Sequence, residues 1–526
     1  MRPIARRGMA ALLLAATAMV HSHPGQAASR LPIAPRDIDS TVTRAMKAFD
    51  VPGVAVGIIK DGKLVFSKGY GVRELGKPAP IDADTLFQIG SNTKAFTAAA
   101  LAMLVDEGKI HWDDRVLEYL PDFQMYDPYV TREFTIRDLL THRSGLGMGA
   151  GDLMFFPTTD FSRAEIIHRL RYLKPASSFR TKFDYDNLLY MVAGQIIPVV
   201  TGQTWEAFVQ ERIFNPLKMQ SCAASYDLIK DRDNIASPHQ RFASGDVKPV
   251  PVTNISVIGS AGTINCNING MTKWLQAQLA GGKTPGGAQL FSEATAAQMW
   301  SINTMQPLDE IAPLTHTHIL GYGLGWEIRD EFGRLRVSHT GGVPGGVTWV
   351  SMIPELQLGV LVFTNQEEGA AMEAIGHQIL DAYLGAPKRD WVDVAVAYKG
   401  RRAAAAEVVQ KEVAKATASA TPPTLPLDSY AGKYVDSWRG EATVRRDGNK
   451  LTLTFSRTSG LQGSLEPYSG NVFIVRWDNR ALNADAFVRF TQTFGQEVEG
   501  MTMRAVSPTT DFSFDFQDLD FHKLQP

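Results

Sequence analysis

The sequence has few cysteines, little net charge and no long apolar segment beyond its N-terminus. Only Cys222 and Cys266 are present among 526 residues, so there is no cysteine-based metal framework. The formal net charge of −2 argues against nucleic acid as the main partner. No later apolar run reaches membrane-spanning length. What is left is an ordinary globular composition, 44% hydrophobic, in a chain long enough for more than one domain.

The N-terminus predicts an export signal. Three arginines in the first seven residues precede a short apolar core at 9–20, and small residues permit cleavage after Ala27. The pair Arg6-Arg7 is compatible with twin-arginine export, although Sec export is simpler. We therefore assign residues 1–27 to a signal peptide. We expect a soluble periplasmic or secreted protein with no membrane anchor after signal removal.

Residues that commonly bind metals or form disulfides are sparse. Export permits a disulfide, but the sequence does not place Cys222 and Cys266 within bonding distance, so we expect two free thiols. His316 and His318 could share one face of a strand, but a His-x-His pair without a third ligand is more often a polar loop. We expect no metal and no cofactor.

The segment QIGSNTKAFTAAALAMLVDEG, residues 88–108, combines a serine, a lysine and a long uncharged run. Gly90 and Ser91 mark a helix start, and residues 95–105 carry no charge, which is typical of a helix buried on every face. Burial and the positive end of the helix dipole would both lower the pKa of Lys94. Ser91 and Lys94 share a helix face, where a neutral amine activates a serine nucleophile. Alone, the pair is equally well explained as a helix cap and a lysine that reaches solvent.

The order of elements predicts an α+β fold for the first 385 residues. Asp61-Gly62 is a two-residue hairpin turn, and we expect this early hairpin to join the late strands in one antiparallel sheet covered by helices. The expected elements are a helix at 37–49, strands at 54–60 and 63–70, mostly helical segments at 161–280, strands between 321 and 365, and a helix at 369–384.

The pattern changes after residue 385. Residues 399–416 predict an exposed helix, and the Pro/Thr/Ala-rich stretch 417–426 predicts a linker. Beyond it, short alternating segments predict strands, including DFSFDF at 511–516. About a hundred residues of this kind favour a small all-β barrel or sandwich domain.

Two further segments carry residues suited to catalysis. FDYDNLLY contains Tyr185 and Asn187 just before a helix, and VSHTGGVPGG contains His339 and Thr340 followed by Gly341 and Gly342 at a strand end. Taken singly, each has a plain structural interpretation: a half-buried tyrosine, a helix cap and a wide hairpin loop.

In this order, Ser-x-x-Lys, Tyr-x-Asn and a basic residue before Thr-Gly resemble the serine β-lactamase and penicillin-binding-protein superfamily. The likeness is closest to class C β-lactamase-like esterases and peptidases, and spans residues 37–385. Segments such as IRDLLTHRSGL (136–146) and GYGLGW (321–326) are similar to family landmarks. The resemblance implies a sheet covered by helices, with an all-helical subdomain.

The resemblance also implies roles for individual residues. Ser91 would be the acylated nucleophile, and Lys94 the base or the charge that tunes the base. Tyr185, the alternative base, would relay protons to the leaving group and to the deacylating water, with a pKa that adjacent Lys94 could lower. His339 would complete the catalytic set. Asn187 would hold Lys94 and the substrate amide. Main-chain N–H groups of Ser91 and Gly342 would form the oxyanion hole, where one donor is worth about 100–1,000-fold in rate. Thr340 and Gly341 would contact substrate, whereas His142 would be a structural loop histidine.

One position departs from the family pattern. β-Lactamases and cell-wall transpeptidases carry lysine where this chain has His339, and a histidine is only partly charged near neutral pH. With histidine at this position, the site depends less on a substrate that carries a free carboxylate beside the scissile bond. This favours a peptidase on small peptides or peptide-like amides, a class that includes D-residue and non-ribosomal peptides such as linearised microcystin. An esterase on small acyl esters is the alternative, followed by a β-lactamase or a catalytically silent peptidoglycan- or β-lactam-binding protein.

The C-terminal part resembles, more weakly, the lipocalin-like β domain of some of these hydrolases, through LDSYAGKYVD and LTLTF. The domains expected are therefore a hydrolase domain at 37–385, a helical and Pro-rich linker at 386–426 and a lipocalin-like β domain at 427–524. Such a domain could roof the cleft or mediate assembly into a homo-oligomer. The sequence does not choose between these roles.

Overall fold

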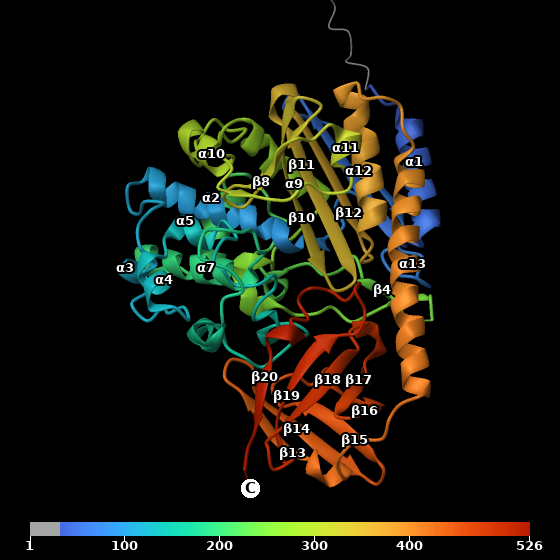
Figure 1. The fold of residues 1–526 in the computed structure, drawn as a ribbon. Helices are drawn as coiled ribbons and strands as arrows, with labels where there is room; N and C mark the ends of the chain where they lie inside the picture. The colour runs from blue at the N-terminus through green and yellow to red at the C-terminus, as the bar shows by residue number, and fades with distance from the viewer. Residues whose placement is uncertain (1–31, 243, 526) are drawn as a thin grey trace, which may run out of the picture.

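The computed structural model describes residues 32–242 and 244–525. The signal-peptide prediction for residues 1–27 lies outside them. An α+β domain is followed by a closed β-barrel, and the two are in contact along one side (Figure 1). Within the described residues no helix is both long enough and apolar enough to cross a membrane.

The first domain is built on one eight-stranded antiparallel sheet of order β2-β1-β12-β11-β10-β9-β8-β7. Val54 of β1 pairs with Thr364 of β12, so the early hairpin joins the late strands as predicted. The strands are β1 (Gly53–Lys60), β2 (Lys63–Gly71), β7 (Thr304–Met305), β8 (Leu320–Tyr322), β9 (Glu327–Glu331), β10 (Arg334–Val343), β11 (Gly346–Ile353) and β12 (Leu358–Thr364). Two small pairs lie outside this sheet: β3 (Phe87–Gln88) with β6 (Asn265–Cys266), and β4 (His239–Arg241) with β5 (Val247–Pro249).

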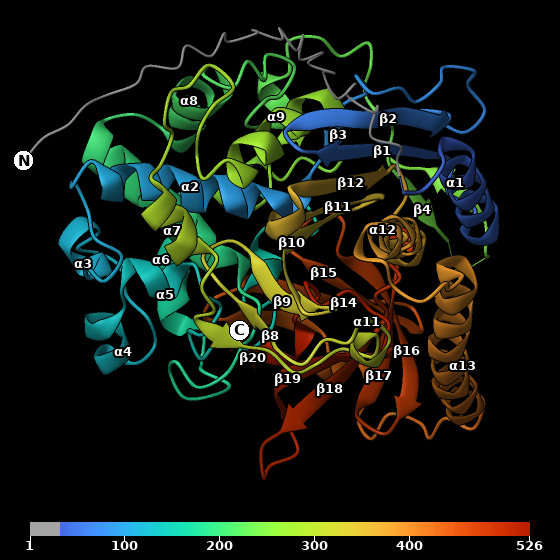
Figure 2. The same ribbon diagram turned by 90° about the horizontal axis from the view of Figure 1, so that it is seen from above.

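Helices cover both faces of this sheet (Figure 2). α1 (Pro35–Phe49) and α12 (Gly369–Leu384) cover one face, and α9 (Ile268–Leu279) covers the other. α2 (Thr93–Asp106) is buried from Thr93 to Leu104, as its uncharged sequence predicts. The other helices are α3 (Val116–Tyr119), α4 (Pro128–Glu133), α5 (Ile136–Leu139), α6 (Arg163–Arg169), α7 (Asn187–Thr201), α8 (Trp205–Val209), α10 (Glu293–Met299) and α11 (Ala312–Thr315).

A 28-residue helix, α13 (Trp391–Ala418), connects the domains and runs down the side of the barrel (Figure 1). The helix expected at 399–416 is longer than predicted. Its first turn is not exposed: Trp391 and Val392 are buried against the first domain, and the Trp391 indole donates to Asp381 over 2.6 Å. The first part of the predicted linker is therefore packed against the first domain as the start of α13.

The second domain is a closed barrel of eight antiparallel strands. Its interior is filled by aromatic side chains such as Tyr430, Phe473 and Phe490, as is typical of small barrels. The strands are β13 (Gly432–Asp436), β14 (Gly440–Asp447), β15 (Lys450–Phe455), β16 (Gln462–Ser469), β17 (Val472–Trp477), β18 (Ala486–Gln492), β19 (Val498–Ala505) and β20 (Asp520–Lys523).

Two sequence-based predictions are wrong. DFSFDF at 511–516 is not a strand but part of the loop between β19 and β20, where Ser513 and Asp515 bond to the first domain and Phe516 stacks on Trp477 of the barrel. Cys222 and Cys266 form a disulfide rather than two free thiols. The neighbouring residues Ala223 and Asn265 pair as antiparallel backbone, which places the two cysteine Cα atoms 4.3 Å apart.

Candidate active site

Ser91 lies in a 3-10 turn (Gly90–Asn92) directly before α2, not at a helix N-cap. The turn is held against the sheet by Thr348, whose hydroxyl donates to Ile89 O over 2.9 Å. Gly90 has a φ of 53°, and a Cβ there would lie 2.8 Å from Gly342 N. Glycine at this position therefore lets the serine turn approach the end of β10.

The Lys94 ammonium group is fully buried beside Ser91. Its Nζ lies 3.0 Å from Ser91 Oγ and donates to Asn187 Oδ1 (2.7 Å) and Ala261 O (3.0 Å). Burial lowers the pKa of Lys94 to about 7. A neutral amine has two N–H bonds and one lone pair. Because Asn187 and Ala261 can only accept there, the lone pair of neutral Lys94 faces the Ser91 hydroxyl.

Tyr185 lies on the other side of Lys94, whose Nζ is 4.7 Å from the centre of the phenol ring. The expected lowering of its pKa is wrong. Burial raises the pKa of Tyr185 above its usual value, and the nearby Ser91 hydroxyl opposes this only in part. The phenol therefore stays protonated in the resting site, which suits a proton donor, and Lys94 is the better base.

His339 is on β10 at the edge of the site, and both of its ring nitrogens are engaged. Nδ1 lies 2.6 Å from Thr340 O, which can only accept, so Nδ1 carries the proton. Nε2 then accepts from the Tyr322 hydroxyl over 2.8 Å. Burial lowers the pKa of His339 to about 3. The ring is therefore neutral at physiological pH, and the expected partial positive charge is wrong.

Thr340 and Gly342 follow His339 along the edge of the pocket, whereas Gly341, which was predicted to contact substrate, does not line it and faces Ile89 instead. A Cβ on Gly341 would lie 1.9 Å from Ile89 O, so only glycine permits this contact between β10 and the serine turn. A Cβ on Gly342 would meet no atom within 4 Å. Ser91, Thr340 and Gly342 all line one pocket of 340 Å³, near the lower end of the usual range of about 300–1,000 Å³.

A hydrogen-bonded chain behind Lys94 was not predicted. Asn187, at the start of α7, donates from Nδ2 to Asp152 Oδ2 over 2.8 Å. The same carboxylate oxygen accepts from the Ser513 hydroxyl over 2.9 Å. Asp152 is fully buried, which raises its pKa to about 8. Ser513 belongs to the barrel domain, so the second domain contributes to the support of Lys94.

The loop that carries Ser513 also closes one side of the pocket. Asp515 accepts from Gly151 N (2.6 Å) and Leu153 N (3.2 Å), which fixes the loop to the first domain. The Phe512 ring then packs edge-on against Tyr185 with 5.9 Å between ring centres. The barrel domain was expected either to roof the cleft or to mediate assembly. In this arrangement it forms part of the cleft wall.

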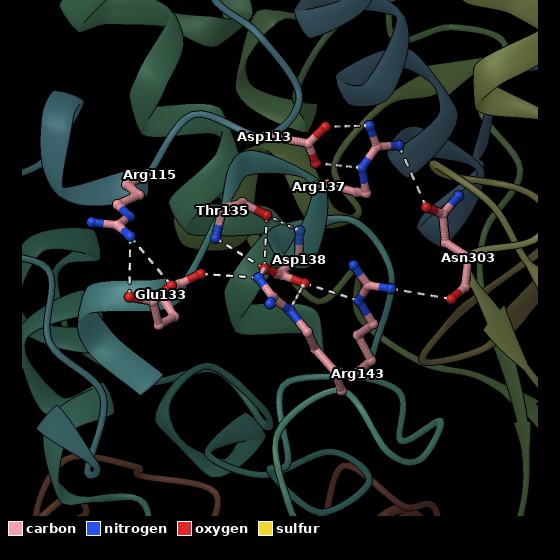
Figure 3. A network of polar contacts seen from close by, with 9 residues as sticks. Asp113, Arg115, Glu133, Thr135, Arg137, Asp138, Arg143 and Asn303 are labelled. Carbon is pink, nitrogen blue, oxygen red and sulfur yellow. Dashed lines mark hydrogen bonds and ion pairs between the residues drawn. The ribbon is translucent and has the colours of Figure 1, made fainter. Parts of the chain in front are cut away.

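A network of polar contacts centred on Asp138 holds the segment that precedes His142 (Figure 3). The fully buried Asp138 carboxylate accepts from Arg143 Nε (2.9 Å) and Arg180 Nη2 (2.6 Å). His142, in the following loop, accepts from Asp186 N over 3.0 Å, and its ring lies 4.2 Å from the Tyr185 ring. His142 thus has the structural position expected of it and orients Tyr185 without facing the pocket.

The walls of the pocket are largely apolar and carry negative rather than positive groups. Among the described residues that line the pocket, none is lysine or arginine. Two are acidic, Glu367 and Asp511. Burial raises the pKa of both carboxyls. Over residues 32–242 and 244–525, no group of three or more His, Cys, Asp or Glu side chains is placed to hold a metal ion.

Comparisons with known proteins agree with this geometry. The beta-lactamase family matches residues 38–384, and a domain of unknown function, DUF3471, matches residues 416–523. The curated relative unguisins hydrolase ungD' from Aspergillus campestris is 29% identical over 464 residues, with 84% of each chain covered. Penicillin-binding protein 4 from Amycolatopsis lactamdurans is 28% identical, over 60% of this chain and 81% of its own. The octameric penicillin-binding protein homologue from Pyrococcus abyssi shares the fold, with a TM-score of 0.62, 21% identity and coverage of 93% and 100%.

Proposed function

The chain belongs to the beta-lactamase family and has the fold of its serine hydrolases, and on that premise we propose that it is a peptidase acting on small peptides or peptide-like amides. Its intermediate is an ester between Ser91 Oγ and the acyl part of the substrate. The predicted signal peptide supports a secreted or periplasmic location. No metal or cofactor takes part in the proposed reaction, and the proposed partner is the substrate alone, with neither nucleic acid nor membrane involved.

Acylation begins with proton transfer from Ser91 to neutral Lys94 across 3.0 Å. Ser91 Oγ attacks the amide carbonyl, and the main-chain N–H groups of Ser91 and Gly342 bind the developing oxyanion. Tyr185 donates its proton to the leaving nitrogen, and protonated Lys94 returns a proton to Tyr185. In deacylation, Lys94 accepts a proton from water, the resulting hydroxide adds to the ester carbonyl, and Lys94 returns the proton to Ser91 Oγ as the ester bond breaks.

The observation that carries this proposal is the charge of the pocket. His339 is neutral, and the pocket is lined by Glu367 and Asp511 with no lysine or arginine. A β-lactam or a C-terminal D-Ala-D-Ala substrate presents a carboxylate beside the scissile bond, and the described residues that line this pocket offer it no lysine or arginine to pair with. A peptide bond remote from a free carboxylate needs no such partner.

The protonated phenol of Tyr185 is an argument for amide substrates rather than esters. Amine leaving groups need a proton as the C–N bond breaks, and a phenol with a raised pKa holds that proton at neutral pH. An esterase is the second candidate, because the apolar side chains of Phe155, Ile258 and Val343 in the pocket suit an acyl chain. A silent binding protein fits less well, because Ser91, Lys94 and Tyr185 keep a reactive arrangement.

The test is a substrate screen of the purified protein with Ser91→Ala as control. The panel comprises L- and D-peptide amides, p-nitrophenyl esters and a chromogenic cephalosporin. We expect turnover of at least one amide series that is lost in Ser91→Ala. Ester turnover without amide turnover would favour the esterase. Cephalosporin hydrolysis at a higher kcat/KM than any amide would contradict the argument from charge.

A further inference from the structure

A second, larger cavity lies between the two domains and helix α13. Its volume is about 1080 Å³, at the upper end of the usual range for ligand sites. It is lined by Phe242 and Val250 of the first domain, Val413 of α13, and Ser459, Leu482 and Val506 of the barrel domain. The barrel thus contributes a wall to a cavity large enough for several amino-acid residues.

This interdomain cavity adjoins the pocket around Ser91. Four residues, Phe156, Pro344, Glu367 and Asp511, line both. A substrate bound at Ser91 can therefore extend past these four residues into the space between the domains. The catalytic pocket by itself, at 340 Å³, holds only a small part of such a substrate.

One chain segment leads from the cavity to the pocket. Residues 249–253 all line the interdomain cavity, and Ile255 and Ile258, just beyond them, line the catalytic pocket. Residues 250–254 belong to no helix or strand. Among the hydrogen bonds within the described residues, none uses the backbone N–H of Val252 or Thr253. The Val252 donor is free to pair with the main chain of an extended peptide, as in β-strand addition.

The charges in the cavity also suit an uncharged chain. Arg476 and Arg480 are paired with Asp485 over 2.8 and 2.6 Å, and Lys399 is paired with Glu368. The basic groups are therefore neutralised by partners within the protein. The remaining walls combine apolar side chains and amides such as Gln240 and Asn483 with the two carboxyls of Glu367 and Asp511. Such walls fit a peptide better than a strongly charged ligand.

From these contacts we propose that the interdomain cavity binds the part of a peptide substrate remote from the scissile bond, along residues 250–253. This inference rests on the proposed peptidase function and deepens it. The preferred substrates are then peptides of several residues, and the barrel domain acts as a specificity domain. The peptide pairs with the N–H of Val252 on one side and contacts the barrel on the other.

The experiment compares alanine peptides of two and six residues, in the L and D series, with product formation followed by liquid chromatography. In wild type we expect the kcat/KM for the six-residue peptide to exceed that for the two-residue peptide by about tenfold or more. Val252→Pro removes one free N–H, and Ser459→Trp fills the cavity from the barrel side. Each should reduce the six-to-two ratio by about tenfold.

Two matched controls accompany these variants. Val252→Ala keeps the N–H and should keep the ratio, and Thr502→Trp adds the same bulk on an exposed barrel strand outside the cavity. A wild-type ratio near one, or an equal effect of Ser459→Trp on both lengths, would overturn the proposal. Hydrolysis of p-nitrophenyl acetate that depends on Ser91 separates the two failures. With that activity present, only the extended site is refuted; without it, the hydrolase function is refuted as well.

Discussion

Replacing Asp152 by asparagine should move the pH profile of Ser91 acylation to lower pH. Lys94 acts as a base only when neutral, so the rate rises with pH through the pKa of Lys94, about 7. The negative charges of Asp152 and Asp186 raise that pKa, against the larger lowering by burial. Removing one of these charges lowers the pKa of Lys94 further, and the neutral base persists in more acidic solution.

The size of the shift follows from the hydrogen-bonded chain. Bonds of 2.7 and 2.8 Å through Asn187 place the two charges about 7 Å apart, where their interaction is worth about 2 kcal/mol at an effective dielectric constant of about 20. That corresponds to about 1.5 pKa units. Since the pKa of Asp152 is itself raised to about 8, the carboxyl is only partly ionised at pH 7. We therefore expect a downward shift of a few tenths of a unit at most, and labelling at pH 6 that is faster by about twofold or less.

The assay is the rate of covalent labelling by a fluorophosphonate between pH 5 and 9, which does not depend on the natural substrate. Ser513→Ala removes a bond that favours the Asp152 carboxylate and should shift the midpoint in the same direction by less. Asp478→Asn, an exposed site on the barrel, should leave the midpoint unchanged. A midpoint in Asp152→Asn that equals that of wild type, or lies above it, would refute the reasoning.

Three further predictions concern the proton donor, the neutral histidine and the disulfide. Tyr185→Phe should reduce kcat on peptide amides by about 100- to 10,000-fold, and much less on p-nitrophenyl esters, whose leaving group needs no proton; equal losses would contradict this role. KM should be flat from pH 5 to 9, because the pKa of His339 is about 3; a KM that worsens between pH 6 and 7 would restore a charged anchor. Replacing both Cys222 and Cys266 by alanine should lower the free energy of unfolding by about 4 kcal/mol for a 44-residue separation, measured by urea unfolding; an unchanged urea midpoint would count against a native disulfide.

The parts of the fold and site that the sequence predicts are those with local signals. The hairpin at Asp61-Gly62 and the helix at 369–384 each have a periodicity or turn contained within a few residues, and the structure has both. Ser91 and Lys94 share one helical turn, so their contact follows from spacing alone. Their convergence with Tyr185 and His339 was expected only from the family resemblance.

What the sequence does not predict depends on contacts between distant segments. Asp152 and Ser513 are 361 positions apart and lie in loops, where no periodicity marks them. DFSFDF alternates like a strand, yet its buried side chains are divided between the first domain, which Ser513 and Asp515 contact, and the barrel, which Phe516 contacts. The lowered pKa of His339 arises from burial beside Tyr322 and Lys94, which a motif of four residues does not reveal.

The most direct test of the account is the site of covalent modification by a fluorophosphonate, located by mass spectrometry of the intact protein and its peptides. We expect one adduct per chain, on Ser91, absent from Ser91→Ala and formed far more slowly in Lys94→Met, whose side chain suits the buried position. No adduct on folded wild type, an adduct elsewhere, or labelling of Lys94→Met at the wild-type rate would contradict the claim that Lys94 activates Ser91.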